Sequence, residues 1–168
     1  MKINIAEIRR MEGSTLHYDL REQFPAVEFD GEQIVFVAPI HVQIAVTNAE
    51  KELWARGTIQ SEMRVACSRC LEEFRQPLAI PYEDEWIAVG QATEEQAETA
   101  LLFEKDEIEI QDRVMEQILL SLPMKTLCSA DCRGLCPSCG QNLNLGQCQC
   151  REDTIDPRLA ELAKWNHD

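Results

Sequence analysis

Cysteine is the residue type in this chain whose spacing indicates chemistry. The protein has 168 residues and eight cysteines, and an upstream pair together with a later run of six makes two sets of four. Zinc binds thiolate sulfur in tetrahedral sites, and two ligands separated by two residues can be presented to one ion by a single tight turn. The candidate metal ligands are Cys67, Cys70, Cys128, Cys132, Cys136, Cys139, Cys148 and Cys150.

We predict two structural zinc ions, each held by cysteines from two separate turns. One ion takes the first tetrad, which we define as Cys67, Cys70, Cys128 and Cys132. The other takes the second tetrad, which is Cys136, Cys139, Cys148 and Cys150. The second tetrad is contiguous and can close locally, whereas the first would pin the chain beyond Pro123 to the turn at Cys67. Four sulfur ligands leave no open position for water, so both sites are expected to be structural rather than catalytic.

Two other uses of the cysteines compete with metal binding. A disulfide framework belongs to oxidising compartments. The first ten residues contain no continuous apolar stretch typical of a secretory signal, and no run of about 18 apolar residues could cross a membrane. We therefore expect a cytoplasmic, reduced protein, in which clustered cysteines favour metal. A thioredoxin-like role for Cys67 and Cys70 would require an alternating βαβ pattern, which the sequence does not show.

The charge balance limits the class of partner. The chain carries 30 acidic and 16 basic residues, for a net charge of −14. Binding to bare nucleic acid or to an anionic membrane surface requires lysine and arginine in excess, so neither is expected. A basic protein partner fits this charge, and so does simple solubility.

Alternating apolar and polar residues predict antiparallel strands in the first half of the chain. Residues 40–47 and 53–66 are interpreted as a hairpin, and a third strand follows Cys70. Cys67 and Cys70 would then lie in a turn between strands. Three large aromatic side chains, Trp54, Phe74 and Trp86, are expected to pack on the sheet.

Sequence patterns in the second half of the chain predict a helix on each side of the cysteine run. Residues 83–109 contain ten acids and one lysine and are interpreted as a solvated connection. Apolar residues at helical spacing predict a helix over about 111–122, stopped by Pro123. Asp156 and Pro157 predict the start of a short C-terminal helix.

The expected fold class is therefore α+β. An antiparallel β-sheet would be packed by a long helix, followed by a small cysteine-rich zinc-binding tail and a short C-terminal helix. The expected division is a β-rich domain over 1–123, which includes the acidic connection 83–109, and a zinc-ribbon-like tail over 124–168.

No catalytic constellation is recognisable in the sequence. The three histidines, His17, His41 and His167, lie in unrelated contexts, and the motifs of zinc proteases, serine hydrolases and phosphate-binding loops do not occur. We therefore expect a protein that is not an enzyme.

Several stretches resemble a known protein family. Residues 65–74, with the sequence VACSRCLEEF, are similar to the central signature of the YceD family, and residues 118–125 and 132–144 are similar to its C-terminal half. The ending at 155–160, IDPRLA, matches as well. The resemblance implies a non-enzymatic ribosome-biogenesis factor that supports accumulation of large-subunit (23S) ribosomal RNA in bacteria and plant plastids.

The resemblance and the charge together lead to hypotheses about partners. A basic ribosomal protein or the pre-ribosomal large subunit is the expected partner, recruited by the acidic segment 83–109. Direct contact with RNA stays open; its local candidates are Arg64, Arg69, Arg75 and Arg133, and the alternative is that nearby glutamates balance these arginines. The alternative function is a thiol or zinc redox sensor that loses metal on oxidation.

Overall fold

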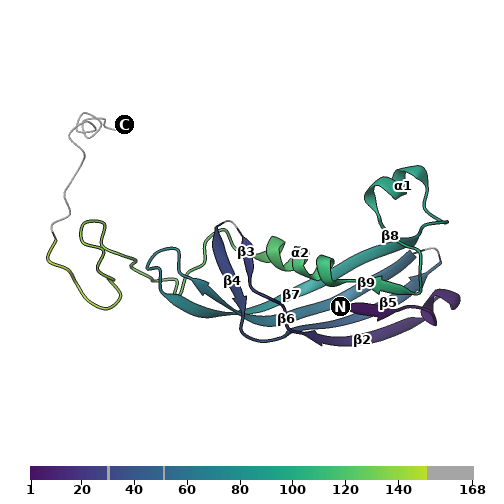
Figure 1. Ribbon diagram of the computed structural model, residues 1–168, viewed down its shortest axis with the longest axis horizontal. Helices are drawn as coiled ribbons and strands as arrows, with labels where there is room; N and C mark the ends of the chain where they lie inside the picture. Colours follow the sequence, from purple (N-terminus) through teal and green to yellow (C-terminus); the bar gives the residue numbers. More distant parts are fainter. Residues whose placement is uncertain (30, 51, 151–168) are drawn as a thin grey trace, which may run out of the picture.

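The computed structural model describes residues 1–150 except for 30 and 51, and long antiparallel strands dominate it (Figure 1). The strands are β1 (Lys2–Asn4), β2 (Thr15–Glu22), β3 (Val27–Phe29), β4 (Glu32–Phe36), β5 (Ile40–Ala49), β6 (Glu52–Ala66), β7 (Glu73–Ala88), β8 (Leu101–Phe103) and β9 (Glu107–Glu109). The helical elements are a 3-10 turn, η1 (Ile8–Arg10), and the helices α1 (Glu94–Thr99) and α2 (Gln111–Ser121). The two longest elements, β6 and β7, have 15 and 16 residues.

The main sheet is built around β6. This strand pairs with β5 on one side and along its whole length with β7 on the other, and β2 pairs with β5 at the edge. Beyond the end of β5, β6 also pairs with β4, which forms a hairpin with β3. All these pairings are antiparallel, whereas β8 adds to the end of β7 in the parallel direction. A separate two-stranded pairing joins β1 to β9.

One face of the sheet is buried, because apolar residues alternate along each long strand. In β5 the buried residues are the even-numbered ones from Ile40 to Val46, and in β6 they include Leu53, Ile59 and Met63. The β5–β6 hairpin predicted from this alternation is confirmed. The buried face forms one apolar cluster with residues of α2, η1, β1 and β9.

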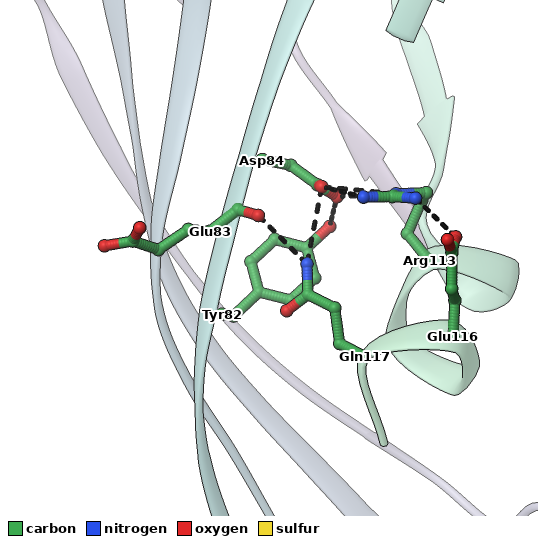
Figure 2. Close-up of polar contacts among 6 residues, drawn as sticks. All are labelled: Tyr82, Glu83, Asp84, Arg113, Glu116 and Gln117. Atoms are coloured by element: carbon green, nitrogen blue, oxygen red, sulfur yellow. Dashed lines mark hydrogen bonds and ion pairs between the residues drawn. The ribbon is translucent and has the colours of Figure 1, made fainter. Parts of the chain in front are cut away.

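Helix α2 packs on β7 through apolar and polar contacts. Val114 and Ile118 are buried in the core cluster. Figure 2 shows the polar contacts: the Asp84 carboxylate accepts hydrogen bonds from the Tyr82 hydroxyl (2.6 Å) and from the Arg113 guanidinium (2.7 Å). The Gln117 amide donates to the Glu83 carbonyl (2.9 Å). These contacts fix the helix on the strand that leads out of the cysteine turn.

The predicted α+β class, with a long helix packed on the sheet, is wrong. The protein is mostly β: α2 has only 11 residues and lies beside β7, while the described residues contribute nine strands. The helix predicted over 111–122 does exist as α2 and ends before Pro123, but it is shorter than the strands that define the fold. The C-terminal helix predicted after Asp156 lies outside the described residues. The domain division at residue 123 stays a prediction.

The segment 83–109 is not the plain solvated connection expected from its acids. Residues 83–88 complete β7, and the segment continues through α1, β8 and β9. Apolar residues anchor it, because Phe103 and Ile108 are buried in the core cluster. The Asp106 carboxylate also forms an ion pair with Arg9 (2.6 Å).

Of the three aromatic side chains expected to pack on the sheet, one does not. Trp86 is buried and Phe74 is half-buried against the core. Trp54 is 42% exposed on the opposite face, where the Arg56 guanidinium lies 5.6 Å from its ring centroid. Its even position in β6 places it out of phase with buried Leu53 and Ala55.

Candidate metal centre

The turn between β6 and β7 presents the first two cysteines of the first tetrad. The Cys67 N–H donates to the Glu72 carbonyl (2.9 Å), and the Cys67 carbonyl accepts from the Leu71 N–H (2.9 Å). Leu71 has a φ of +60°, a conformation uncommon for residues other than glycine. This tight turn holds Cys67 and Cys70 as buried side chains.

The chain returns to this turn after α2. The Thr126 hydroxyl donates to the Ala66 carbonyl (2.6 Å), and the Ser68 N–H donates to the Thr126 carbonyl (2.8 Å). These hydrogen bonds position the segment that carries Cys128 and Cys132. The first tetrad therefore joins the sheet to the tail, as the spacing predicted.

The sulfur positions of the first tetrad fit one tetrahedral ion. The four ligand atoms lie within 4.8 Å of one another. The Cys67 and Cys132 sulfurs are 3.7 Å apart, and so are those of Cys70 and Cys128. A zinc–sulfur bond of about 2.3 Å gives a tetrahedron with an edge of about 3.8 Å, which agrees with both distances. A disulfide would require about 2.05 Å, and all eight cysteines are free.

The second tetrad is built from two local turns. Its four sulfurs also lie within 4.8 Å of one another. The Gly140 N–H donates to the Cys136 carbonyl (2.9 Å), and Gly140 has a φ of +73°. Glycine meets this conformation without steric cost, which explains its place after the Cys136–Cys139 pair. Cys136 is buried, whereas Cys139 and Cys150 are exposed.

The electrostatics of each tetrad favour a bound cation. Burial alone would raise the pKa of the Cys67 thiol, but N–H groups of Cys128, Cys70 and Arg69 directed at its sulfur lower this pKa to about 6. By contrast, burial and the neighbouring cysteines raise the pKa of Cys128 to about 12. The second tetrad has the same contrast: N–H groups of Cys139 and Ser138 lower the pKa of Cys136 to about 6. Several thiolates this close repel one another, and a divalent cation would remove that conflict.

Sequence analysis missed two asparagines at the first tetrad. The Asn144 side-chain amide donates to the Cys132 sulfur (3.3 Å), and this hydrogen bond is the main reason that the pKa of the Cys132 thiol is lowered. The Asn142 amide reaches the Glu72 carboxylate (3.4 Å). In the sequence, an asparagine among clustered cysteines indicates only a turn. Its spacing from the cysteines does not predict which sulfur its side-chain amide contacts. Only the folded hairpin brings the Asn144 amide to Cys132.

Three of the four arginines considered for RNA contact have side-chain partners within the protein. Arg64 lies 3.6 Å from the Glu73 carboxylate, and Arg75 lies 3.1 Å from that of Glu62. The Arg69 guanidinium donates to the Cys132 carbonyl (2.9 Å). The contacts of Arg64 and Arg75 agree with the alternative given above, in which nearby glutamates balance the arginines.

Comparison with known proteins identifies the family. The family model described as large ribosomal RNA subunit accumulation protein YceD matches residues 55–165, which is more than half of the chain and includes both tetrads. The chain belongs to the YceD family. The resemblance found in the sequence is thereby confirmed.

The similar proteins in this family are distant. An uncharacterised protein of Mycobacterium tuberculosis is 24% identical, over 98% of this chain and 80% of its own length. The uncharacterised protein YlbN of Bacillus subtilis is 26% identical, over 98% of this chain and 95% of its own. A chloroplastic large ribosomal RNA subunit accumulation protein, YCED homolog 1 of Arabidopsis thaliana, is 23% identical over 74% of this chain and 47% of its own. No solved structure matches the chain.

Among residues 1–150 without 30 and 51, no helix has the length and apolar character needed to span a bilayer.

Proposed function

We propose that this protein is a non-enzymatic ribosome-biogenesis factor that supports synthesis, processing or stability of large-subunit (23S) ribosomal RNA. The observation that carries the proposal is the YceD family match over residues 55–165. The name of the family ties it to the large ribosomal subunit. We propose that the protein acts by binding its partners rather than by catalysis. The two cysteine tetrads support this, because four sulfur ligands suit closed, structural metal sites.

Each tetrad is proposed to hold one structural zinc ion. The 3.7 Å sulfur separations in the first tetrad support this assignment, because they agree with the edge of a zinc–sulfur tetrahedron. In the first tetrad the ion would lock the β6–β7 turn to the segment after α2. A structural zinc contributes on the order of 10 kcal/mol to folding, comparable to the stability of a whole domain.

The proposed partner is a basic ribosomal protein or a basic surface of the pre-ribosomal large subunit. The support is the net charge of −14 together with exposed acids Glu94, Glu98, Glu104 and Glu107, which we call the acidic end. The elements that carry these acids lie at the opposite end of the molecule from the two tetrads, a region we call the cysteine end (Figure 1). The acidic end would attract basic proteins, and the cysteine end would make the specific, shape-complementary contact with the partner.

The function is tested by deleting the gene and measuring the ratio of large-subunit to small-subunit ribosomal RNA. We expect the ratio to fall on deletion and to recover with the full-length protein. The variant Cys67→Ser, which breaks the first tetrad, should fail to restore it, while the exposed-surface variant Glu85→Gln should succeed. An unchanged ratio in the deleted strain would contradict the proposal.

Redox sensing is the second candidate, and one observation favours it. Cys139 and Cys150 of the second tetrad are exposed, so peroxide could reach their sulfurs. Measuring zinc before and after mild peroxide separates the two functions. A sensor would release zinc and take it up again after thiol reduction, whereas a purely architectural protein would keep both ions.

A further inference from the structure

One hairpin connects the two tetrads. Leu135 and Asn142 form an antiparallel bridge, and the Leu143 N–H donates to the Gly134 carbonyl (2.9 Å). Inside this hairpin, the Cys136 N–H donates to the Gln141 carbonyl (2.9 Å). The tip of the hairpin carries Cys136 and Cys139, two ligands of the second tetrad. Closure of the second tetrad therefore fixes the shape of the hairpin.

The base of the same hairpin lies on the first tetrad. The Leu135 N–H donates to the carbonyl of Arg69, which stands between Cys67 and Cys70 (3.1 Å). Gly134 approaches so closely that an added Cβ would lie 2.9 Å from the Arg69 carbonyl oxygen. The glycine therefore permits a contact that a side chain would prevent, and the hairpin base is held against the β6–β7 turn.

Asn144 lies at the end of this hairpin, and its side chain contacts a sulfur of the first tetrad. Its amide nitrogen donates to the Cys132 sulfur (3.3 Å) and to the Asn142 side-chain oxygen (2.9 Å). Its amide oxygen accepts from the Arg133 N–H (2.8 Å). Because the oxygen accepts a backbone N–H, the orientation of the amide is settled, and its NH₂ group must face the sulfur.

A hydrogen bond from an amide to a coordinating sulfur orients the ligand and offsets its negative charge. Residues that contact metal ligands in this way typically change metal affinity by 10- to about 100-fold when they are replaced. Asn144 can donate this hydrogen bond only while the hairpin keeps its conformation. That conformation depends on closure of the second tetrad.

We propose that Asn144 is a positioning residue for the first tetrad and that the two tetrads bind metal cooperatively through the 134–144 hairpin. The inference rests on the proposal that each tetrad holds a zinc ion. A metal ion in the second tetrad raises the affinity of the first, and by linkage a metal ion in the first raises the affinity of the second by the same factor. Three cysteines of the first tetrad are buried and only one of the second is, so a chelator reaches the second tetrad first.

The test compares four versions of the full-length protein in a double-mutant cycle. They are the wild type, Asn144→Ala, the double variant Cys136→Ser/Cys139→Ser, which removes the second site, and the combination of all three changes. Cadmium-113 NMR gives a separate resonance for each sulfur-bound ion, and competition with a chelator yields the affinity of each site. Gln147→Ala, which removes an exposed amide from the same loop, is the matched control.

We expect removal of the second site to lower the cadmium affinity of the first by about 10-fold or more. Asn144→Ala should lower it by 10- to about 100-fold, and in that background removal of the second site should have much less further effect. Gln147→Ala should bind both ions as the wild type does.

Three results would count against these proposals in different ways. Equal affinity of the first site with and without the second would overturn the coupling. Full additivity of the two changes would overturn the role of Asn144. A wild type that binds no ion in either tetrad would contradict the zinc assignment as well, which distinguishes that failure from a failure of coupling alone.

Discussion

The side chain of Asp84 is only 1% exposed, and it faces α2 from the middle of a strand (Figure 2). Its carboxylate accepts from the Tyr82 hydroxyl and the Arg113 guanidinium. Burial in the first place, and the nearby Asp84 carboxylate in the second, raise the pKa of Tyr82 above its ordinary value. The Gln117 amide also donates to this carboxylate (3.4 Å). Removing the carboxylate would take away the Tyr82 hydroxyl's acceptor and leave Arg113 paired with Glu116 alone.

Asp84→Ala should therefore lower the free energy of unfolding by about 2–3 kcal/mol. Breaking a fully buried ion pair costs about 3–5 kcal/mol, and the expected value is smaller because the Arg113 side chain is 30% exposed and can regain water. Urea unfolding followed by circular dichroism measures the change. Glu85→Ala, which removes an exposed acid from the next position, is the control and should stay within about 0.5 kcal/mol of the wild type. Equal stability of the two variants would show that the network does not hold α2.

The two tetrads should respond differently to the loss of one sulfur. Cys67→Ser should destabilise the whole sheet, because the first tetrad ties the β6–β7 turn to the segment after α2 and Cys67 is fully buried. Cys148→Ser should loosen mainly the tail and lower the melting temperature of the sheet far less. Thermal unfolding followed by circular dichroism and by tryptophan fluorescence, to which buried Trp86 contributes, reports on the sheet. Equal losses of melting temperature in the two variants would argue against a bridging role for the first tetrad.

At the scale of elements, the β5–β6 pairing leaves no room for a side chain at Gly57. A Cβ added there would lie 1.9 Å from the Gln43 carbonyl oxygen and 2.7 Å from the Ile44 Cα. Gly57→Ala should force the two strands apart and lower the free energy of unfolding by about 3 kcal/mol or more. Gly90→Ala is the matched control, since nothing lies within 4 Å of its added Cβ. The measurement is denaturant unfolding, and a Gly57→Ala protein as stable as the Gly90→Ala protein would contradict this close approach.

The free edge of β7 is protected by proline. Pro77 and Pro81 pair with Glu62 and Thr58 of β6, four residues apart on the same strand. Strand β8 covers β7 only over 86–88. Proline cannot donate a hydrogen bond, so it is tolerated at a strand edge and discourages pairing with another chain there.

Strand alternation and cysteine spacing were predictable from the sequence because both are local patterns. The hairpin and α2 follow from the periods of the apolar residues, and the end of α2 follows from Pro123. The grouping of cysteines into two tetrads follows from their number and from the local closure of the second set. The same alternation also indicates that Trp54 faces outward, since it lies between buried Leu53 and Ala55 in β6. The prediction that Trp54 packs on the sheet conflicts with this alternation and is wrong.

Pairings distant in sequence were not predictable. The parallel addition of β8 to β7 and the pairing of β9 with β1 involve two three-residue strands, β8 and β9, within the acidic segment 83–109. Phe103 and Ile108 anchor these strands in the core, but the many acids around them hide this apolar pattern in the sequence. The predicted fold class was wrong for a related reason, because the segment 83–109 was interpreted as a connection although it contains the end of β7 together with β8 and β9. The contact of Asn144 with Cys132 likewise depends on a hairpin that only the folded chain defines.

At the scale of the whole molecule, the acidic end and the cysteine end are separate regions (Figure 1). Four substitutions to glutamine at Glu94, Glu98, Glu104 and Glu107 should slow association with pre-ribosomal particles and flatten its dependence on salt. Electrostatic steering accelerates association by 10- to about 1,000-fold at low ionic strength. Asp106 is left intact because it pairs with Arg9 and supports the fold.

The control for this prediction removes the same number of charges from the other end of the molecule. Glu28, Glu73 and Asp131 are exposed and Glu62 is half-buried. Glu62 and Glu73 form surface ion pairs worth about 0–1 kcal/mol. Association rates of the two variants are compared at low and high salt. If both variants associate equally fast, net charge rather than the acidic end sets the rate. Tight binding of the wild type to naked large-subunit RNA at physiological salt would contradict a protein-directed partner.

Metal analysis of the purified full-length protein tests the central claim most directly, because the two closed sites underlie the proposed link between sheet and tail. The protein is purified without added metal or chelator, and elemental analysis is combined with a count of reactive thiols. The account predicts two zinc ions per chain, with the thiols becoming reactive only after a chelator removes the metal. A protein without zinc whose eight cysteines all react as free thiols, while the sheet stays folded, would contradict it.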